Sequence, residues 1–179
     1  SKAINSIQGA SDRLGEIIKQ VLDYVSLESN PAVKKEKVDL SESMKVALAS
    51  TKKTAESKEL NLVSKIAEGL FISGDLERIE KGFHYLFMDT LGRTPQKGEI
   101  RIMAAEKDKN ILIEVERSGE LLGSEGFDVL ETGQSQMNHQ RNLGVGLAVF
   151  KRIINDHSGT VRLENRQNRT VIVTSLKAI

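Results

Sequence analysis

The stretch NLGVGLAVFKRIINDHSG, residues 142–159, decides how the fold of this chain is interpreted. Two glycines one residue apart, Gly144 and Gly146, precede a segment whose apolar residues recur with the spacing of an amphipathic helix. Backbone N–H groups at the start of a helix favour an anion, so this turn is a candidate phosphate site. The same glycines also suit the close packing of a loop on a helix, and only the rest of the chain distinguishes the two interpretations.

Composition excludes several classes of protein. The 179 residues suffice for one core with an appendage. The 26 basic and 25 acidic residues leave a net charge of +1, and no basic tract is interleaved with aromatic residues, so nucleic acid is excluded as a partner. The absence of cysteine excludes disulfides and thiolate metal sites. No apolar run reaches the ~18 residues that span a bilayer, so we expect no membrane contact in this segment and a cytoplasmic location, including the cytoplasmic part of a larger sensor.

An N-terminal helix is predicted over residues 2–29. Its apolar residues follow one another at spacings of three and four and form the apolar stripe Ile4, Ile7, Leu14, Ile18, Val21 and Val25. Such spacing is typical of a helix that packs on another helix, in a partner subunit or in a neighbouring segment. The alternative is packing on its own domain. Pro31 ends the helix because proline cannot donate the helical hydrogen bond.

The remaining chain alternates helical and strand patterns. Asp39 is a predicted N-cap, with Glu42 three residues later, for a helix that ends near Glu56. Further helices are expected over 76–91 and 146–156, and strands over 60–66, 70–75, 99–106, 110–116, 160–165 and 170–176. Residues 32–39 are predicted to be a charged connector. The order ααββαββαββ predicts an α+β protein, a two-layer sandwich with helices on one face of a mixed sheet.

Three stretches in this order resemble a known family. GDLERIEKGFHYLFMDTLGRTP (74–95), ILIEVERSGELL (111–122) and NLGVGLAVFKRIINDHSGTVRLEN (142–165) together resemble the ATP-binding catalytic domain of sensor histidine kinases, within the GHKL ATPases. SDRLGEIIKQVLDYVSLESN (11–30) resembles the second helix of the dimerization and phosphoacceptor hairpin. The resemblance implies a dimerization helix over 1–31, a histidine-kinase-like domain over 32–179 and a homodimer formed through the N-terminal helix.

The first box of that family is altered. Its helix carries an asparagine whose side-chain oxygen binds Mg²⁺, and Asp89 stands at the matching position. Tyr85 stands where a further asparagine is common, and Gly92 where a lysine is usual. A carboxylate is an acceptable Mg²⁺ ligand, so Asp89 is the candidate metal residue, although its charge is unfavourable beside a triphosphate. The alternative is that Asp89 is a solvated helix residue.

The second box lacks its defining residue. The family pattern begins with an aspartate that accepts a hydrogen bond from the adenine amino group, and Arg117 stands there, followed by Gly119 and by Leu121 in place of a second glycine. An arginine has no acceptor. Losing a charge-assisted hydrogen bond costs about 1.5 to 3 kcal/mol, roughly 10- to 150-fold in affinity. The alternative interpretation is a strand end with a solvated or salt-bridged Arg117.

The third box retains two of its three glycines. Asn142, Gly144 and Gly146 occupy the alternating positions where the family has glycine. The resemblance therefore implies a remnant nucleotide pocket, made of Asp89, Gly119, Gly144 and Gly146, that takes ATP and Mg²⁺ if any nucleotide binding survives. Residues 119–144 correspond to the family's lid, and without nucleotide we expect that lid to be mobile.

No histidine replaces the phosphoacceptor, which in this family lies on the first hairpin helix. His84 is expected to pack within a helix, and His139 to be solvated. His157 is expected to place a cation at a helix C-terminus, with Gly159 taking the left-handed turn. The histidines lie far apart in sequence and without paired acids, and no nucleophile signature such as G-x-S-x-G occurs, so the sequence assigns no catalytic residue.

Two functional hypotheses follow. The first is a transmitter module of a two-component signalling protein, a pseudokinase with weak or no ATP binding that acts by dimerization and by docking a response regulator or a partner histidine kinase. The alternative is an active ATP-dependent histidine kinase that phosphorylates a histidine upstream of this segment. Arg117 discriminates between them and favours the pseudokinase, because adenine recognition needs an acceptor where the sequence supplies a cation.

Overall fold

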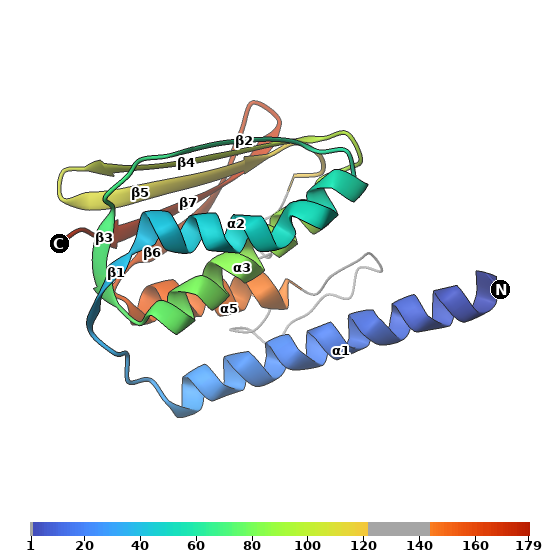
Figure 1. Ribbon diagram of the computed structural model, residues 1–179, viewed down its shortest axis with the longest axis horizontal. Helices are drawn as coiled ribbons and strands as arrows, with labels where there is room; N and C mark the ends of the chain where they lie inside the picture. Colours follow the sequence, from blue (N-terminus) through green and yellow to red (C-terminus); the bar gives the residue numbers. More distant parts are fainter. Residues whose placement is uncertain (1, 122–143) are drawn as a thin grey trace.

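The computed structural model describes residues 2–121 and 144–179. Helices α2 (Leu40–Ser57), α3 (Leu76–Arg93) and α5 (Val145–Asp156) cover one face of a five-stranded sheet (Figure 1). The strands of this sheet are, in spatial order, β2 (Asn61–Ile66), β4 (Glu99–Lys107), β5 (Asn110–Arg117), β7 (Arg169–Lys177) and β6 (Thr160–Arg166). The pair β2–β4 is parallel and the other pairs are antiparallel. This arrangement confirms the predicted α+β sandwich with a mixed sheet.

A small second sheet corrects the expectation for the connector. Residues 32–39 contain strand β1 (Glu36–Asp39), which pairs antiparallel with β3 (Phe71–Gly74). Buried Val38 lies opposite buried Ile72, so pairing with a segment distant in sequence stabilises this strand. The charged residues around Val38 do not predict a strand from the local sequence. The two strands on either side of the turn at Glu68 and Gly69 consequently belong to different sheets.

Local sequence signals set the ends of several elements. Asp39 caps α2 by accepting a hydrogen bond from the Glu42 N–H at 3.1 Å, as predicted. Asp75 caps α3 in the same way, through the Arg78 N–H at 3.2 Å. The β4–β5 hairpin turns at Asp108–Lys109, whose φ angles of 51° and 62° are typical of a two-residue type I′ turn.

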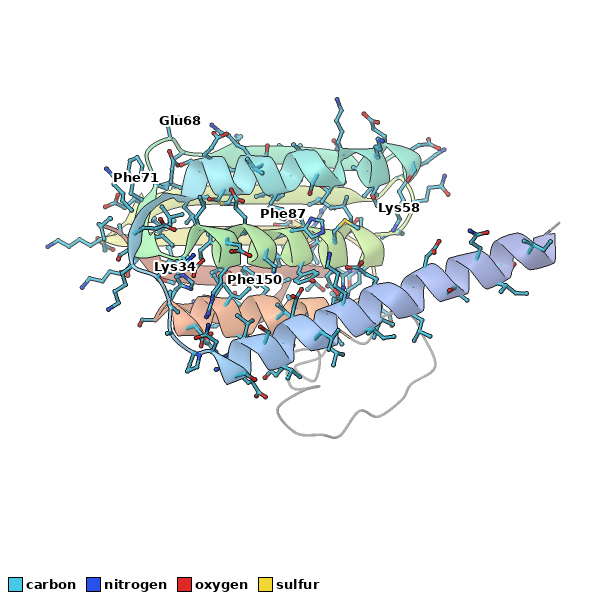
Figure 2. The ribbon with its side chains drawn as sticks, turned by 60° about the horizontal axis from the view of Figure 1, so that its bottom comes forward. Lys34, Lys58, Glu68, Phe71, Phe87 and Phe150 are labelled. Atoms are coloured by element: carbon cyan, nitrogen blue, oxygen red, sulfur yellow. The ribbon has the colours of Figure 1, made fainter. Side chains whose placement is uncertain are left out.

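Aromatic side chains occupy the helix layer of the core. Phe83 and Phe87 on α3 stack with ring centroids 5.8 Å apart, and Phe150 on α5 lies 5.6 Å from Phe83. Figure 2 shows Phe87 and Phe150 on the two neighbouring helices. All three are fully buried, so they fix α3 against α5 and thereby the two helices that carry the candidate site.

Helix α1 (Lys2–Ser29) combines the two interpretations given for it. Its C-terminal half packs on α5, with Leu27 only 7% exposed, whereas its N-terminal half projects beyond the domain (Figures 1 and 2). There the apolar stripe faces solvent, with Ile4 62% and Ile7 70% exposed. Among the helices that the structure describes, none is both long and apolar enough to cross a membrane.

Candidate functional site

The candidate site lies where α3, the end of β5 and the start of α5 meet. Asp89 is on the last turns of α3, Arg117 is the final residue of β5, and Gly144 immediately precedes α5. The structure brings Asp89 and Arg117 within electrostatic range of each other. The α5 start is adjacent to α3 as well, since a Cβ built on Gly146 lies 3.5 Å from the Tyr85 Cβ.

The Arg117 side chain points into the protein. Alternate residues of β5 are buried beneath the helices, namely Ile111, Ile113 and Val115, and Arg117 continues this inward series with only 2% of its surface exposed. Its Nη1 makes a long contact of 3.4 Å with the Ser118 carbonyl oxygen. The alternative of a solvated Arg117 is therefore wrong. The strand places a guanidinium inside the layer where the resembling family has an adenine-binding carboxylate.

Asp89 is bound by an arginine one helical turn later. The Arg93 Nε donates to both carboxylate oxygens of Asp89, at 3.0 Å and 2.9 Å. The side chain of Asp89 is only 8% exposed, so the solvated alternative is wrong for this residue too. A metal ion bound to Asp89 would therefore lie next to the positive charge of Arg93, which opposes its binding.

The charges in this cluster perturb one another. Burial raises the pKa of Asp89, and the attraction of Arg93 opposes that rise. Burial lowers the pKa of Arg117, and repulsion from Arg93 lowers it further, whereas Asp89 acts in the opposite direction. Asp89 therefore serves as a buried counter-ion for two guanidinium groups, those of Arg93 and Arg117.

The described residues do not fit Mg-ATP in the manner of the resembling family. The position that should accept the adenine amino group holds a donor-only side chain, Arg117, and the candidate metal ligand Asp89 is bound at both oxygens to Arg93.

The glycine and leucine of the second box have structural explanations. Gly119 has a φ of +108°, and a Cβ there would lie 2.7 Å from the Pro95 Cδ, so the turn itself requires glycine. Leu121 is 42% exposed and does not fill the pocket. The change of the pocket thus comes from Arg117 and not from Leu121.

The start of α5 keeps its turn but is covered by α1. Gly144 adopts the left-handed conformation with a φ of 64°, and no side chain caps the helix. A Cβ on Gly146 would lie 3.5 Å from the Gln20 Nε2 of α1, so that helix faces this glycine. Asn142 and His139 lie outside the described residues, as does most of the expected lid over 119–144.

Polar contacts tie α1 to the altered first box. The Tyr85 hydroxyl donates to the Asp23 carboxylate, and the Lys81 Nζ lies 3.2 Å from the same group. Burial and this hydrogen bond raise the pKa of Tyr85. Arg78 on α3 also donates to the Asn30 carbonyl oxygen at 2.8 Å. Tyr85, where the family commonly has asparagine, therefore binds the N-terminal helix.

Sequence reasoning missed two residues near the site. Arg93 lies four residues after Asp89, and that helical spacing of opposite charges was a readable signal. Lys58 gave no such signal. Its Nζ donates to the carbonyl oxygens of Leu91 at 2.7 Å and Gly92 at 3.0 Å, which places a cation at the C-terminal end of α3, beside the position where the family has a lysine.

The described histidines have structural roles. His84 is half-buried and shares a 3.0 Å hydrogen bond with the Ser50 hydroxyl, in keeping with the expected packing role. His157 accepts a hydrogen bond from the Asp75 N–H through Nε2 at 2.9 Å, which requires an unprotonated Nε2 and corrects the expected cation. Ser158, with a φ of 58°, takes the left-handed turn expected at Gly159. Within residues 2–121 and 144–179, no group of three His, Cys, Asp or Glu side chains could hold a metal ion.

Helices over a mixed sheet, with the described residues of the three boxes gathered where α3, β5 and α5 meet, define a histidine kinase ATPase-type domain. Sequence relatives agree. The chain is 24% identical to sensor histidine kinase ZraS of Escherichia coli over 89% of this chain and 34% of ZraS. It is also 24% identical to sensor protein VanSB of Enterococcus faecalis, over 92% of this chain and 38% of VanSB. The chain thus spans little more than a third of these relatives, and no family model matches it.

Solved structures share the fold. Histidine kinase ThkA in complex with response regulator protein TrrA superimposes with a TM-score of 0.78 at 20% identity, over 100% of this chain and 51% of that chain. Histidine kinase AdeS of Acinetobacter baumannii gives a TM-score of 0.76 at 18% identity, over 98% of this chain and 83% of that chain. These matches confirm the predicted fold, that of a histidine kinase ATPase-type domain.

Proposed function

We propose that this chain is a pseudokinase transmitter, which relays a signal through its dimerization helix and its docking partners and binds Mg-ATP weakly or not at all. The observation that carries this proposal is the buried Arg117 beside the Asp89–Arg93 pair. A donor-only guanidinium replaces the adenine acceptor, and the Arg93 cation lies against the carboxylate that would otherwise bind the metal. The remaining pocket residues, Gly119, Gly144 and Gly146, then serve folding.

The proposal gives each part of the chain a role. Residues 1–31 form the dimerization helix and residues 32–179 the histidine-kinase-like domain. The exposed apolar stripe, in which Leu14 is 59% and Ile18 is 51% exposed, supports a homodimer formed through this helix. A response regulator or a partner histidine kinase is the proposed docking partner, and the complex of the similar kinase ThkA with TrrA supports the first. The coupling of Tyr85 to Asp23 links the helix to the altered site.

Calorimetric titration with Mg-ATP tests the proposal. The wild-type chain should show no saturation up to about millimolar nucleotide. The triple variant Arg117→Asp, Leu121→Gly and Asp89→Asn restores the family's residue types at these three positions and should gain measurable affinity. Saturation of the wild type at low micromolar nucleotide would support the active kinase instead.

Light scattering tests the dimer separately. Ile18→Asp places a charge in the apolar stripe and should reduce the mass to that of a monomer, whereas Ser6→Asp, outside that stripe, should not. A wild-type chain that is already monomeric would contradict the proposed homodimer.

A further inference from the structure

Two buried guanidinium groups share one carboxylate at the end of β5. Arg117 is only 2% exposed, and the side chains of Arg93 and Asp89 are 18% and 8% exposed. Arg93 binds both Asp89 oxygens, whereas no hydrogen bond joins Arg117 to Asp89 among the described residues. Glu120 also attracts Arg117, but it is exposed, so water screens its charge. The buried side chains therefore carry one positive charge in excess.

Most N–H donors of the Arg117 guanidinium lack an acceptor. The group has five such donors, and its one hydrogen bond within the described residues is the 3.4 Å contact of Nη1 with the Ser118 carbonyl oxygen. Ile100 on β4 and Thr170 on β7 flank it in register, and the Thr170 hydroxyl donates to Asn165 instead. Buried polar groups of native proteins are hydrogen-bonded, to an ion or to water where protein atoms are lacking. We therefore expect a further acceptor beside Arg117.

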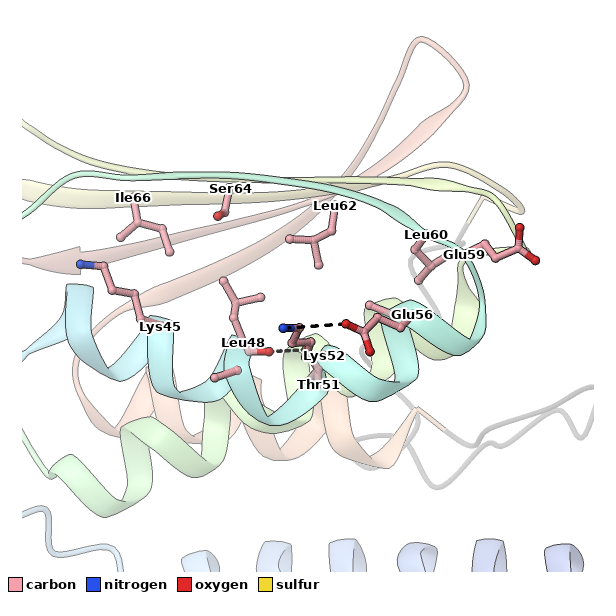
Figure 3. A pocket seen from close by; sticks show the side chains of 12 residues that line it. Lys45, Leu48, Thr51, Lys52, Glu56, Glu59, Leu60, Leu62, Ser64 and Ile66 are labelled. Atoms are coloured by element: carbon pink, nitrogen blue, oxygen red, sulfur yellow. Dashed lines mark hydrogen bonds and ion pairs between the residues drawn. The ribbon is translucent and has the colours of Figure 1, made fainter.

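The charged side chains around the groove between α2 and β2 are, in contrast, paired. This groove has a volume of about 550 Å³, and its charged lining residues are Lys45, Lys52, Glu56 and Glu59 (Figure 3). Each of them has an oppositely charged partner at 2.6 to 3.8 Å, as Figure 3 shows for Lys52 and Glu56. This groove offers no excess charge to a ligand, whereas the end of β5 does.

The charge and the donor geometry at the end of β5 favour a small monocarboxylate. A guanidinium is a planar fork that donates two parallel hydrogen bonds to a carboxylate or a phosphate. A phosphate group carries about 1.5 to 2 negative charges at pH 7 and would leave an excess of negative charge beside Asp89. A carboxylate carries one and neutralises the site. Chloride also carries one, but it cannot match both arms of the fork.

We propose that Arg117 binds a small monocarboxylate at the end of β5. The free donors of the guanidinium hold the carboxylate, and Arg93, which stays on Asp89, supplies the second positive charge of the site. The inference rests on the proposed function, because a pocket that held adenine at this strand end would require Arg117 to turn away from it. The altered pocket then takes an organic anion in place of a nucleotide.

Proton–nitrogen correlation NMR of the full chain with sodium acetate tests the proposal. The Nε–H signal of Arg117, identified by its loss in Arg117→Gln, should shift saturably, with half of the shift at roughly millimolar acetate. Acetamide has the same shape without the charge and should bind at least about tenfold more weakly. Chloride and inorganic phosphate, each titrated at the same ionic strength, should also bind at least about tenfold more weakly.

Charge variants should change the affinity in opposite directions. Asp89→Asn adds one positive charge to the excess and should tighten acetate binding about tenfold. Arg93→Gln removes the excess and frees Asp89 to pair with Arg117, so it should weaken binding at least about tenfold, whereas Arg93→Lys keeps the charge and should stay within about threefold. Arg162→Gln, at a side chain that is 69% exposed, should have no effect. Each variant is used only after circular dichroism shows wild-type helix and strand content.

Three results would overturn the proposal. The first is the absence of a saturable shift in the wild type, which would mean that water alone satisfies Arg117. The second is tighter binding of phosphate or chloride than of acetate. The third is an affinity that Asp89→Asn and Arg93→Gln leave unchanged.

A titration of the same wild-type sample with Mg-ATP separates this inference from the proposed function. Saturation at low micromolar nucleotide would contradict the pseudokinase, whatever acetate does. If neither Mg-ATP nor acetate saturates, only the carboxylate site is wrong.

Discussion

Reversing the charge of Arg117 tests how the buried charges of Arg117, Asp89 and Arg93 stabilise the protein. Arg117→Asp would place a second carboxylate beside the buried Asp89, with Arg93 as the shared counter-ion. An uncompensated buried charge costs about 3 to 5 kcal/mol, which for a chain of this size lowers Tm by about 10 °C. Urea unfolding and differential scanning calorimetry measure the two quantities.

A matched pair of variants isolates the cause of that loss. Adding Asp89→Asn to Arg117→Asp removes the like-charge contact and leaves Arg93 to pair with the introduced carboxylate, so at least about half of the lost stability should return. Arg162→Asp reverses an arginine that is 69% exposed on the same sheet and should cost less than about 1 kcal/mol. The reasoning fails if Arg117→Asp is as mild as Arg162→Asp, or if Asp89→Asn lowers stability further.

Three further predictions concern other parts of the chain. Asp23→Asn weakens the hydrogen bond from the Tyr85 hydroxyl and should speed amide exchange in the C-terminal half of α1 about tenfold, whereas Asp12→Asn on the exposed half should leave it unchanged. Because burial raises the pKa of Asp89, the stability that this residue contributes is greatest below its ordinary pKa of about 3.9 and is lost as pH rises through the folded value. The unfolding free energy of wild type minus that of Asp89→Asn should therefore fall between about pH 3 and about pH 8, and a rising difference would refute the direction. Gly159→Ala introduces a Cβ at 2.7 Å from Ile154, Leu176 and Ser175 atoms and should cost about 1 to 3 kcal/mol in urea unfolding, whereas Gly15→Ala, with nothing within 4 Å, should stabilise the chain by up to about 1 kcal/mol.

The fold was largely predictable because its signals are local. Alternation in β4 and β5, aspartate caps on α2 and α3, and the 3.6-residue spacing in α3 and α5 each act within a few residues. Strand β1 was not predictable, because four residues with charged neighbours become a strand only through pairing with β3, more than 30 positions away. Local pattern thus gave the layers and missed a strand that depends on a distant partner.

The candidate site was predictable in its residue types but not in its contacts. Arg117 could be recognised as a donor in an acceptor's place, yet its burial follows from the inward phase of β5, which a strand end does not reveal. The pairing of Asp89 with Arg93 was readable from helical spacing, whereas the bond from Tyr85 to Asp23 joins residues 62 positions apart. Interactions between separate elements require the three-dimensional structure.

The central claim is that the Arg117 guanidinium takes the place of an adenine acceptor. A crystal structure of the chain grown with Mg²⁺ and a non-hydrolysable ATP analogue tests it most directly. The account predicts Arg117 buried beside Asp89 and no ordered base at the end of β5. An ordered adenine packed there, with Arg117 turned out to solvent, would contradict it.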